Sequence, residues 1–148
     1  MFLTVLKALT FAGLSGLNGR LGWLLRRQFY MRWFEYMGQK VTIKSGVEFI
    51  NPGGIALAEA AVIERYVRLR CLGQNSQIRL GNQATLEQGV DIRTHWQGQI
   101  LIGDRTYVGP YSCLSGDSIT IGEDCLISSH VGIVNRDIVE TVASTKTE

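Results

Sequence analysis

The stretch from Ile102 to Ile133 decides the fold, and it reads IGDRTYVGPYSCLSGDSITIGEDCLISSHVGI. Large aliphatic residues recur in it at steps of six positions, interrupted once by a step of seven. Short, regular repetition of this kind is the sequence signature of a solenoid, in which each repeat is one unit of backbone. The positions concerned are Ile102, Val108, Leu114, Ile121, Ile127 and Ile133.

The same period extends toward the N-terminus in three further triplets of large apolar residues. These triplets are Met37, Ile43 and Phe49, then Leu57, Ile63 and Leu69, and then Leu80, Leu86 and Ile92. A second pattern supports the first, because the residue four positions after each of the first two members of a triplet is small or β-branched. These residues are Val41, Val47, Ala61, Val67, Ala84, Val90, Thr106, Ser112, Cys125 and Val131.

A six-residue repeat corresponds to one short strand and one corner, with the large side chain inside and the small one where two walls converge. Three walls close a triangular coil, and coils stack through parallel-strand hydrogen bonds about 4.8 Å apart. Because no coil can bury its own apolar face, stacking supplies the core. The sequence therefore predicts an all-β parallel β-helix of about five coils over residues 37–138. A β-sandwich would instead need two-residue alternation with variable turns.

The steps between triplets predict one special edge of the prism. From one triplet to the next the step is 8, 11, 10 or 7 residues, and each insertion follows the third wall. The extra residues therefore project from the same edge, where polar loops on a rigid scaffold are a common location for chemistry. The inserted segments are residues 51–54, 71–76, 95–98 and 115–118, with Asn135, Arg136 and Asp137 following Ile133.

These repeats, together with the stretches Arg26-Arg27-Gln28-Phe29-Tyr30 and Ile121-Gly122-Glu123-Asp124-Cys125-Leu126-Ile127, resemble the hexapeptide-repeat acyltransferases. The similarity covers about residues 27–137 and is closest to the sugar and polysaccharide O-acetyltransferases. The resemblance implies a left-handed β-helix, which is an exception to the usual right-handed crossover. It also implies a homotrimer that uses acetyl-coenzyme A (acetyl-CoA) as co-substrate and acetylates a sugar or glycan hydroxyl.

In that family a histidine in a loop leaving the third wall is the general base for the acceptor hydroxyl. The matching loop here runs from Val134 to Ile138, and the histidine would be expected at about Ile138. Isoleucine cannot accept a proton, so it cannot act as the general base. Residues 139–148 have no hexapeptide pattern, so we expect an irregular tail and a chain that is truncated relative to the family. The alternative function is therefore a catalytically inactive β-helix that acts as a trimeric structural or interaction module.

The candidate site residues are, for catalysis, His95, His130 and Asp137, and, for substrate binding, Trp96, Asp117 and Asn135. His95 falls on the special edge, where Asp117 or Asp137 can orient it as a general base. His130 falls near a corner and faces outward, and Trp96 is suited to stacking on a sugar or adenine ring. The alternative interpretation is that both histidines are solvated surface residues.

No metal is expected, because a zinc carbonic anhydrase of the related β-helix type needs three histidine ligands and the chain has two histidines. No Gly-rich phosphate loop, nucleophile elbow or nucleic-acid-binding module is visible in the sequence. Cys71, Cys113 and Cys125 are odd in number and lack metal-ligand spacing, which indicates a reducing compartment such as the cytoplasm.

Residues 1–36 predict a basic amphipathic helical segment. Residues 1–44 contain seven basic residues against Glu35 alone, a net charge of +6, so the remainder carries −4 within the total of +2. Aromatic and arginine side chains are mixed along residues 20–34, as in helices that lie in the headgroup layer. We therefore expect peripheral binding to an anionic membrane at its inner face. Packing of this segment on the β-helix itself or on a neighbouring subunit is the alternative.

Overall fold

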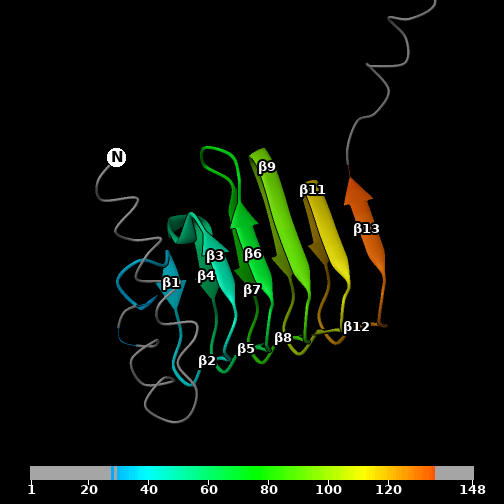
Figure 1. Cartoon of the computed structure of the whole chain (residues 1–148), viewed down its shortest axis with the longest axis horizontal. Coiled ribbons are helices and arrows are strands. Elements are labelled where there is room, and N and C mark those ends of the chain that lie inside the picture. The colour runs from blue at the N-terminus through cyan, green and yellow to red at the C-terminus, as the bar shows by residue number, and fades with distance from the viewer. Residues whose placement is uncertain (1–27, 29, 136–148) are drawn as a thin grey trace, which may run out of the picture.

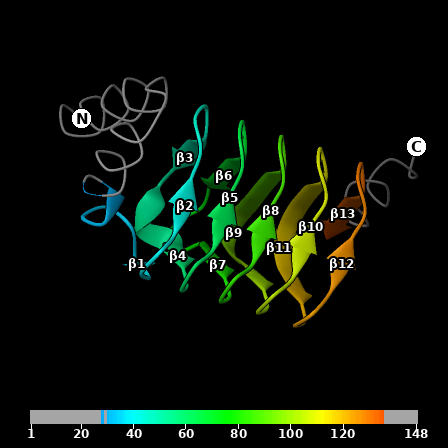
Figure 2. The same cartoon turned by 90° about the horizontal axis from the view of Figure 1, so that it is seen from below.

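The structure is a computed structural model that describes Gln28 and residues 30–135 (Figure 1). The described chain contains β-strands and almost no helix, and it winds as a left-handed parallel β-solenoid of about five turns, as predicted. Figure 2 shows the turns side by side along the long axis, with β2, β5, β8, β10 and β12 in sequence order. Most of the predicted helical segment (residues 1–36) and all of the predicted tail (139–148) lie outside the described residues.

Three parallel walls form the prism. The first wall consists of β1 (Tyr36–Met37), β4 (Ile55–Leu57), β7 (Gln77–Leu80) and the C-terminal parts of β9 (Asp91–Ile102) and β11 (Cys113–Ile121). The second consists of β2 (Thr42–Ile43), β5 (Val62–Ile63), β8 (Thr85–Leu86), β10 (Tyr107–Val108) and β12 (Leu126–Ile127). The third consists of β3 (Glu48–Ile50), β6 (Arg68–Cys71), the N-terminal parts of β9 and β11, and β13 (Gly132–Asn135).

The predicted six-residue register is confirmed at every wall. On the second wall, the large residues of successive triplets are direct partners in the ladder: Ile43, Ile63, Leu86, Val108 and Ile127. In the middle coils these side chains are fully buried, which is the burial that holds the stack together. At the ends of the described stack burial is incomplete, and Met37, Ile121, Ile127 and Ile133 are only partly covered.

The small residues occupy the interior near the corners, also as predicted, and two of them have a further role. The Thr106 hydroxyl donates to the carbonyl of Gly122 (2.6 Å) and accepts from the backbone N–H of Cys125 (3.1 Å). The Ser112 hydroxyl makes the equivalent pair of bonds with Ser128 and Val131 of the next coil. A buried hydroxyl at this position therefore links adjacent coils and satisfies its own hydrogen bonds.

The sharp turn at the first corner, between the first and second walls, is made by residues other than glycine. The left-handed backbone conformation at the first corner belongs to Lys40, Ala60, Gln83, Arg105 and Asp124. A glycine such as Gly103 is needed for a different reason, since a Cβ there would lie 2.5 Å from the carbonyl carbon of Gly122 and 2.6 Å from the Glu123 nitrogen. Coils stack more closely at this corner than a side chain permits.

An additional interior column escapes the six-residue pattern. It lies on the first wall, two residues before the first member of each triplet from the second to the fifth, and its members Ile55, Ile78, Ile100 and Ile119 are all buried. These residues follow the inserted segments, and they lengthen the first wall toward the third. In the third and fourth coils, β9 and β11 consequently run across the third edge without a break, apart from a register shift between Gly116 and Ser118.

The beginning of the described stack is covered by aromatic side chains. The rings of Tyr30 and Phe34 pack on Phe49 of β3, with centroid distances of 5.4 and 4.8 Å. This part of the predicted N-terminal segment thus contacts the β-helix. Within Gln28 and residues 30–135, the structure contains no helix with the length and apolar character needed to cross a membrane.

Candidate functional site on the third edge

The structure confirms that every insertion projects from one edge of the prism. This edge, called the third edge from here on, joins the third wall to the next first wall and consists of residues 51–54, 71–76, 95–98 and 115–118. The segments stack closely: a Cβ on Gly98 would lie 2.7 Å from both the Cα of Asp117 and the carbonyl oxygen of His95. The backbone of Gly73 approaches that of Trp96 in the same way. The third edge is therefore one continuous surface along the stack.

His95 and Ser115 meet where the third wall reaches this edge. On β9 the side chain of Thr94 is fully buried inside the coil, so its neighbours Arg93 and His95 lie on the outer face. Ser115 is the ladder partner of Arg93 on the next coil, and its Oγ lies 3.4 Å from Nε2 of His95. This is a long hydrogen bond whose direction depends on the histidine tautomer.

The sequence identified His95 but not Ser115, because only the ladder register shows that the two residues meet. Of the predicted orienting carboxylates, Asp117 is exposed at the third edge, and within the described chain no hydrogen bond or ion pair joins it to His95. Asp137 lies outside the described residues, as does Ile138. The group that orients the imidazole in the structure is thus a serine hydroxyl.

Two other predicted residues have structural contacts on or near the edge. Trp96 adopts a left-handed backbone conformation and is 79% exposed, so its indole is available to a ligand. The Asn135 side-chain amide donates to the carbonyl of Ser118 at 2.5 Å. Asn135 therefore ties the last described coil to the third edge.

His130 lies elsewhere. It occupies the second corner, between the second and third walls, in a left-handed conformation, and its ring stacks on Tyr111 with centroids 5.4 Å apart. The full length of the third wall separates this corner from the third edge. The structure therefore does not bring His130 together with His95.

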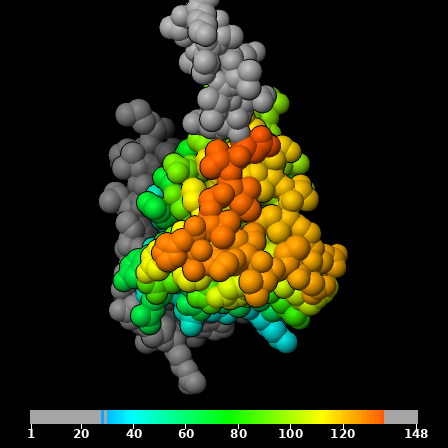
Figure 3. All heavy atoms as spheres, turned by 90° about the vertical axis from the view of Figure 1, so that its right-hand side faces the viewer, coloured from blue at the N-terminus to red at the C-terminus, as the bar shows by residue number. Residues whose placement is uncertain are grey.

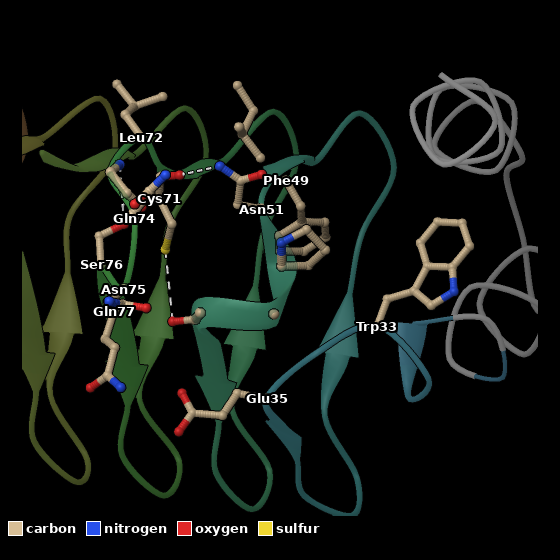
Figure 4. Close-up of a pocket in the computed structure, with 15 residues that line it drawn as sticks. Trp33, Glu35, Phe49, Asn51, Cys71, Leu72, Gln74, Asn75, Ser76 and Gln77 are labelled. Carbon is tan, nitrogen blue, oxygen red and sulfur yellow. Dashed lines mark hydrogen bonds between the residues drawn. The ribbon is translucent and has the colours of Figure 1, made fainter. Parts of the chain in front are cut away.

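A groove of about 810 Å³ opens on the third edge beside the first two coils (Figure 4). Most of its lining comes from the inserted segments 51–54 and 71–76, which the sequence placed on this edge but did not name as candidate site residues. Its lining is rich in carboxamides and also includes an indole and a carboxylate. In Figure 4 the side chains of Ser76 and Gln77 lie on one side of the view and Trp33 on the other. The polar lining residues are Glu35, Asn51, Gln74, Asn75, Ser76 and Gln77.

Hydrogen bonds hold the floor of this groove in place. The Asn51 amide donates to the carbonyl of Cys71 at 2.7 Å, and the Cys71 thiol lies 3.7 Å from the carbonyl oxygen of Gly54. Burial raises the pKa of the Cys71 thiol, so this cysteine remains a protonated structural group. Gly73 lines the groove, and its backbone also approaches that of Trp96 on the next coil.

The remaining observations limit the chemistry. Within Gln28 and residues 30–135, no group of three or more His, Cys, Asp or Glu side chains is arranged to hold a metal ion. Figure 3 looks onto the end of the stack, where β12 and β13 lie in front and the interior residues are only partly buried.

Comparison with known protein-family models found no match to this chain, and a search of curated proteins found no similar sequence.

Proposed function

We propose that this chain is an acyltransferase of the hexapeptide-repeat type, which transfers acetyl from acetyl-CoA to a sugar or glycan hydroxyl at the third edge. The observation that carries the proposal is the contact between His95 and Ser115 beside an amide-lined groove. A hydroxyl already lies within hydrogen-bonding distance of Nε2, and this is the geometry that a general base needs toward an acceptor hydroxyl.

In the proposed reaction, Nε2 of His95 accepts the proton of the acceptor hydroxyl while the hydroxyl oxygen attacks the thioester carbonyl. The tetrahedral intermediate then collapses, the bond from carbon to sulfur breaks, and the imidazolium returns its proton to the departing thiolate. Ser115 holds the imidazole in position before the acceptor binds, and the acceptor hydroxyl then takes the place of the Ser115 hydroxyl at Nε2. This assignment gives His95 the role that the family's loop histidine has, and for which Ile138 is unsuited.

The groove supports a carbohydrate acceptor. Side-chain amides offer both donors and acceptors, which suits sugar hydroxyls, and the lining includes Asn51, Gln74, Asn75 and Gln77. The exposed indole of Trp96, between the groove and Ser115, provides an apolar face for a sugar or adenine ring. By resemblance to the family, the active form is a homotrimer with acetyl-CoA between neighbours, located in the cytoplasm and held at the membrane by residues 1–36.

A catalytically silent trimeric scaffold is the second candidate. The absence of a carboxylate contact to His95 in the described chain favours it, because an unoriented imidazole is a weaker base. Retention of every interior position of the repeat is compatible with either function.

The deciding experiment measures acetyl-CoA binding by titration calorimetry on the full chain, followed by thiol release with a panel of sugar acceptors. We expect His95→Gln to lower kcat by roughly 10²–10⁴-fold, the usual contribution of a general base. His130→Gln is the matched control, since it removes the other histidine at a distant corner. A folded protein that binds no acetyl-CoA at millimolar concentration would favour the scaffold.

A further inference from the structure

The outer face of the third wall carries more positive charge than its acidic residues neutralise. β6 presents Arg68 and Arg70, and β9 presents Asp91 and Arg93. The ladder register places Arg68 opposite Asp91 and Arg70 opposite Arg93. Like charges directly across a ladder are destabilising, so the second pair needs a compensating anion.

Asp91 is already engaged by the other two arginines. Nη2 of Arg70 lies 2.7 and 2.6 Å from the two carboxylate oxygens of Asp91, which is only 8% exposed. Nη2 of Arg68 is 3.4 Å from one of them. Both oxygens are thus occupied, and the carboxylate has little capacity left for Arg93.

Arg93 has no oxygen acceptor among the described residues. Its one hydrogen bond there runs from Nη2 to the sulfur of Cys113 at 3.8 Å, and sulfur is a weak acceptor. The Nε–H groups of Arg93 and Arg70 are both shielded from solvent and lack a partner within the described chain. An unsatisfied, shielded donor on a charged group is costly, and a ligand oxygen would remove that cost.

The remaining donors at this place belong to the candidate active site. His95 lies two residues beyond Arg93 on the same outer face of β9, and Ser115 is the ladder partner of Arg93 on β11. Guanidinium, hydroxyl and imidazole groups from three successive coils therefore adjoin one another where the third wall meets the third edge. This donor-rich surface is suited to an oxyanion.

We propose that Arg93, together with Arg70 and Ser115, binds a carboxylate or phosphate group of the substrate beside His95. The planar guanidinium fork matches both oxyanions, which a lysine would not do equally well. The assignment rests on the proposed function in one respect, namely that the bound anion belongs to a reactant of acetyl transfer. Its source is either an acidic sugar of the acceptor, such as a uronate, or the phosphates of coenzyme A.

Anion binding is tested without catalysis, by titration calorimetry on the full chain at constant ionic strength. The probes are glucuronate, adenosine 3′,5′-bisphosphate and inorganic phosphate, with glucose as the neutral comparison. We expect saturable binding of at least one anion, and we expect it to be tighter than any binding of glucose. Tighter binding of glucuronate assigns the site to the acceptor, and tighter binding of the bisphosphate assigns it to the donor.

Arg93→Gln should weaken the binding roughly 10- to 100-fold, as expected for a lost charge-assisted hydrogen bond, and Arg93→Lys should restore part of it. Arg105→Gln is the matched control, because Arg105 is an exposed arginine that pairs with Asp124 at the first corner. Circular dichroism and thermal melting confirm that each variant is folded.

The proposal is overturned if the folded wild-type chain binds none of the three anions, or if Arg93→Gln binds them as tightly as wild type does. Failure of the proposed function has a different signature. In that case the chain binds the anion and this binding depends on Arg93, but no acetyl transfer occurs with any acceptor.

Discussion

The imidazole of His95 and the hydroxyl of Ser115 lie on neighbouring coils, 3.4 Å apart from Nε2 to Oγ, although 20 positions separate them in the sequence. The contact exists because Ser115 is the ladder partner of Arg93, two residues before His95. Any change in the length of the intervening coil would shift one side chain relative to the other. The candidate site therefore depends on the register of the stack, and its consequences can be tested by substitution.

Ser115→Ala tests the role of this hydroxyl. If Ser115 positions the imidazole and also helps to bind the substrate anion, kcat for acetyl transfer should fall roughly tenfold, about the net contribution of one hydrogen bond, and the KM of the anionic substrate should rise. Steady-state kinetics measures both parameters, and Ser129→Ala at the second corner is the control. A loss as large as that of His95→Gln would instead identify Ser115 as a nucleophile.

Gly98→Ala tests the close stacking of the third edge. The new methyl group would meet the Cα of Asp117 and the carbonyl oxygen of His95 at 2.7 Å, so we expect a destabilisation of about 1–3 kcal/mol. Urea denaturation measures it. Gly132→Ala is the matched comparison, because nothing lies within 4 Å of a Cβ at that position. Equal stability of the two variants would contradict the stacking described for this edge.

Ile92→Ala and Ile127→Ala test how burial varies along the stack. Ile92 is fully buried in the third coil, and its truncation should cost about 2–5 kcal/mol in the free energy of unfolding. Ile127 occupies the equivalent position on another wall of the last described coil but is only partly buried. Its truncation to alanine should therefore lower the free energy of unfolding by a clearly smaller amount. Thermal or urea denaturation separates the two, and the reverse order would be inconsistent with the fold.

The pH dependence of stability tests the first corner. The side-chain amide and backbone N–H of Asn82 both donate to the Asp104 carboxylate and lower its pKa. A carboxylate with a lowered pKa stabilises the folded state above its unfolded pKa of about 3.9, and this contribution disappears as the pH falls through the lower folded value.

Asp104→Asn should therefore flatten the acid limb of the stability curve below about pH 4, and Asn82→Ala should flatten it only in part, because the backbone donor remains. Chemical denaturation at a series of acidic pH values measures the slope. An unchanged slope in Asp104→Asn would show that this carboxylate is not linked to folding.

The sequence by itself determined the repeat, because the interior of a solenoid imposes the same size restriction on every coil. Residues such as Ile63, Leu86 and Val108 fall in the predicted register, and the small residue Ala84 lies at a corner as expected. The special edge was also predictable, because inserted residues do not fit within the close-packed walls and must project from an edge between two walls. His95 and Trp96 were placed on that edge from spacing alone.

Only the tertiary structure decided which side chains meet. The interior column that includes Ile78 and Ile100 was missed because the residues that follow each inserted segment extend the first wall. Likewise, the contact of His95 with Ser115 and the crowding of Arg70 against Arg93 depend on which residues of successive coils become ladder partners. That pairing is set by hydrogen bonds between coils, and a six-residue period constrains inward-facing residues but not their outward-facing neighbours.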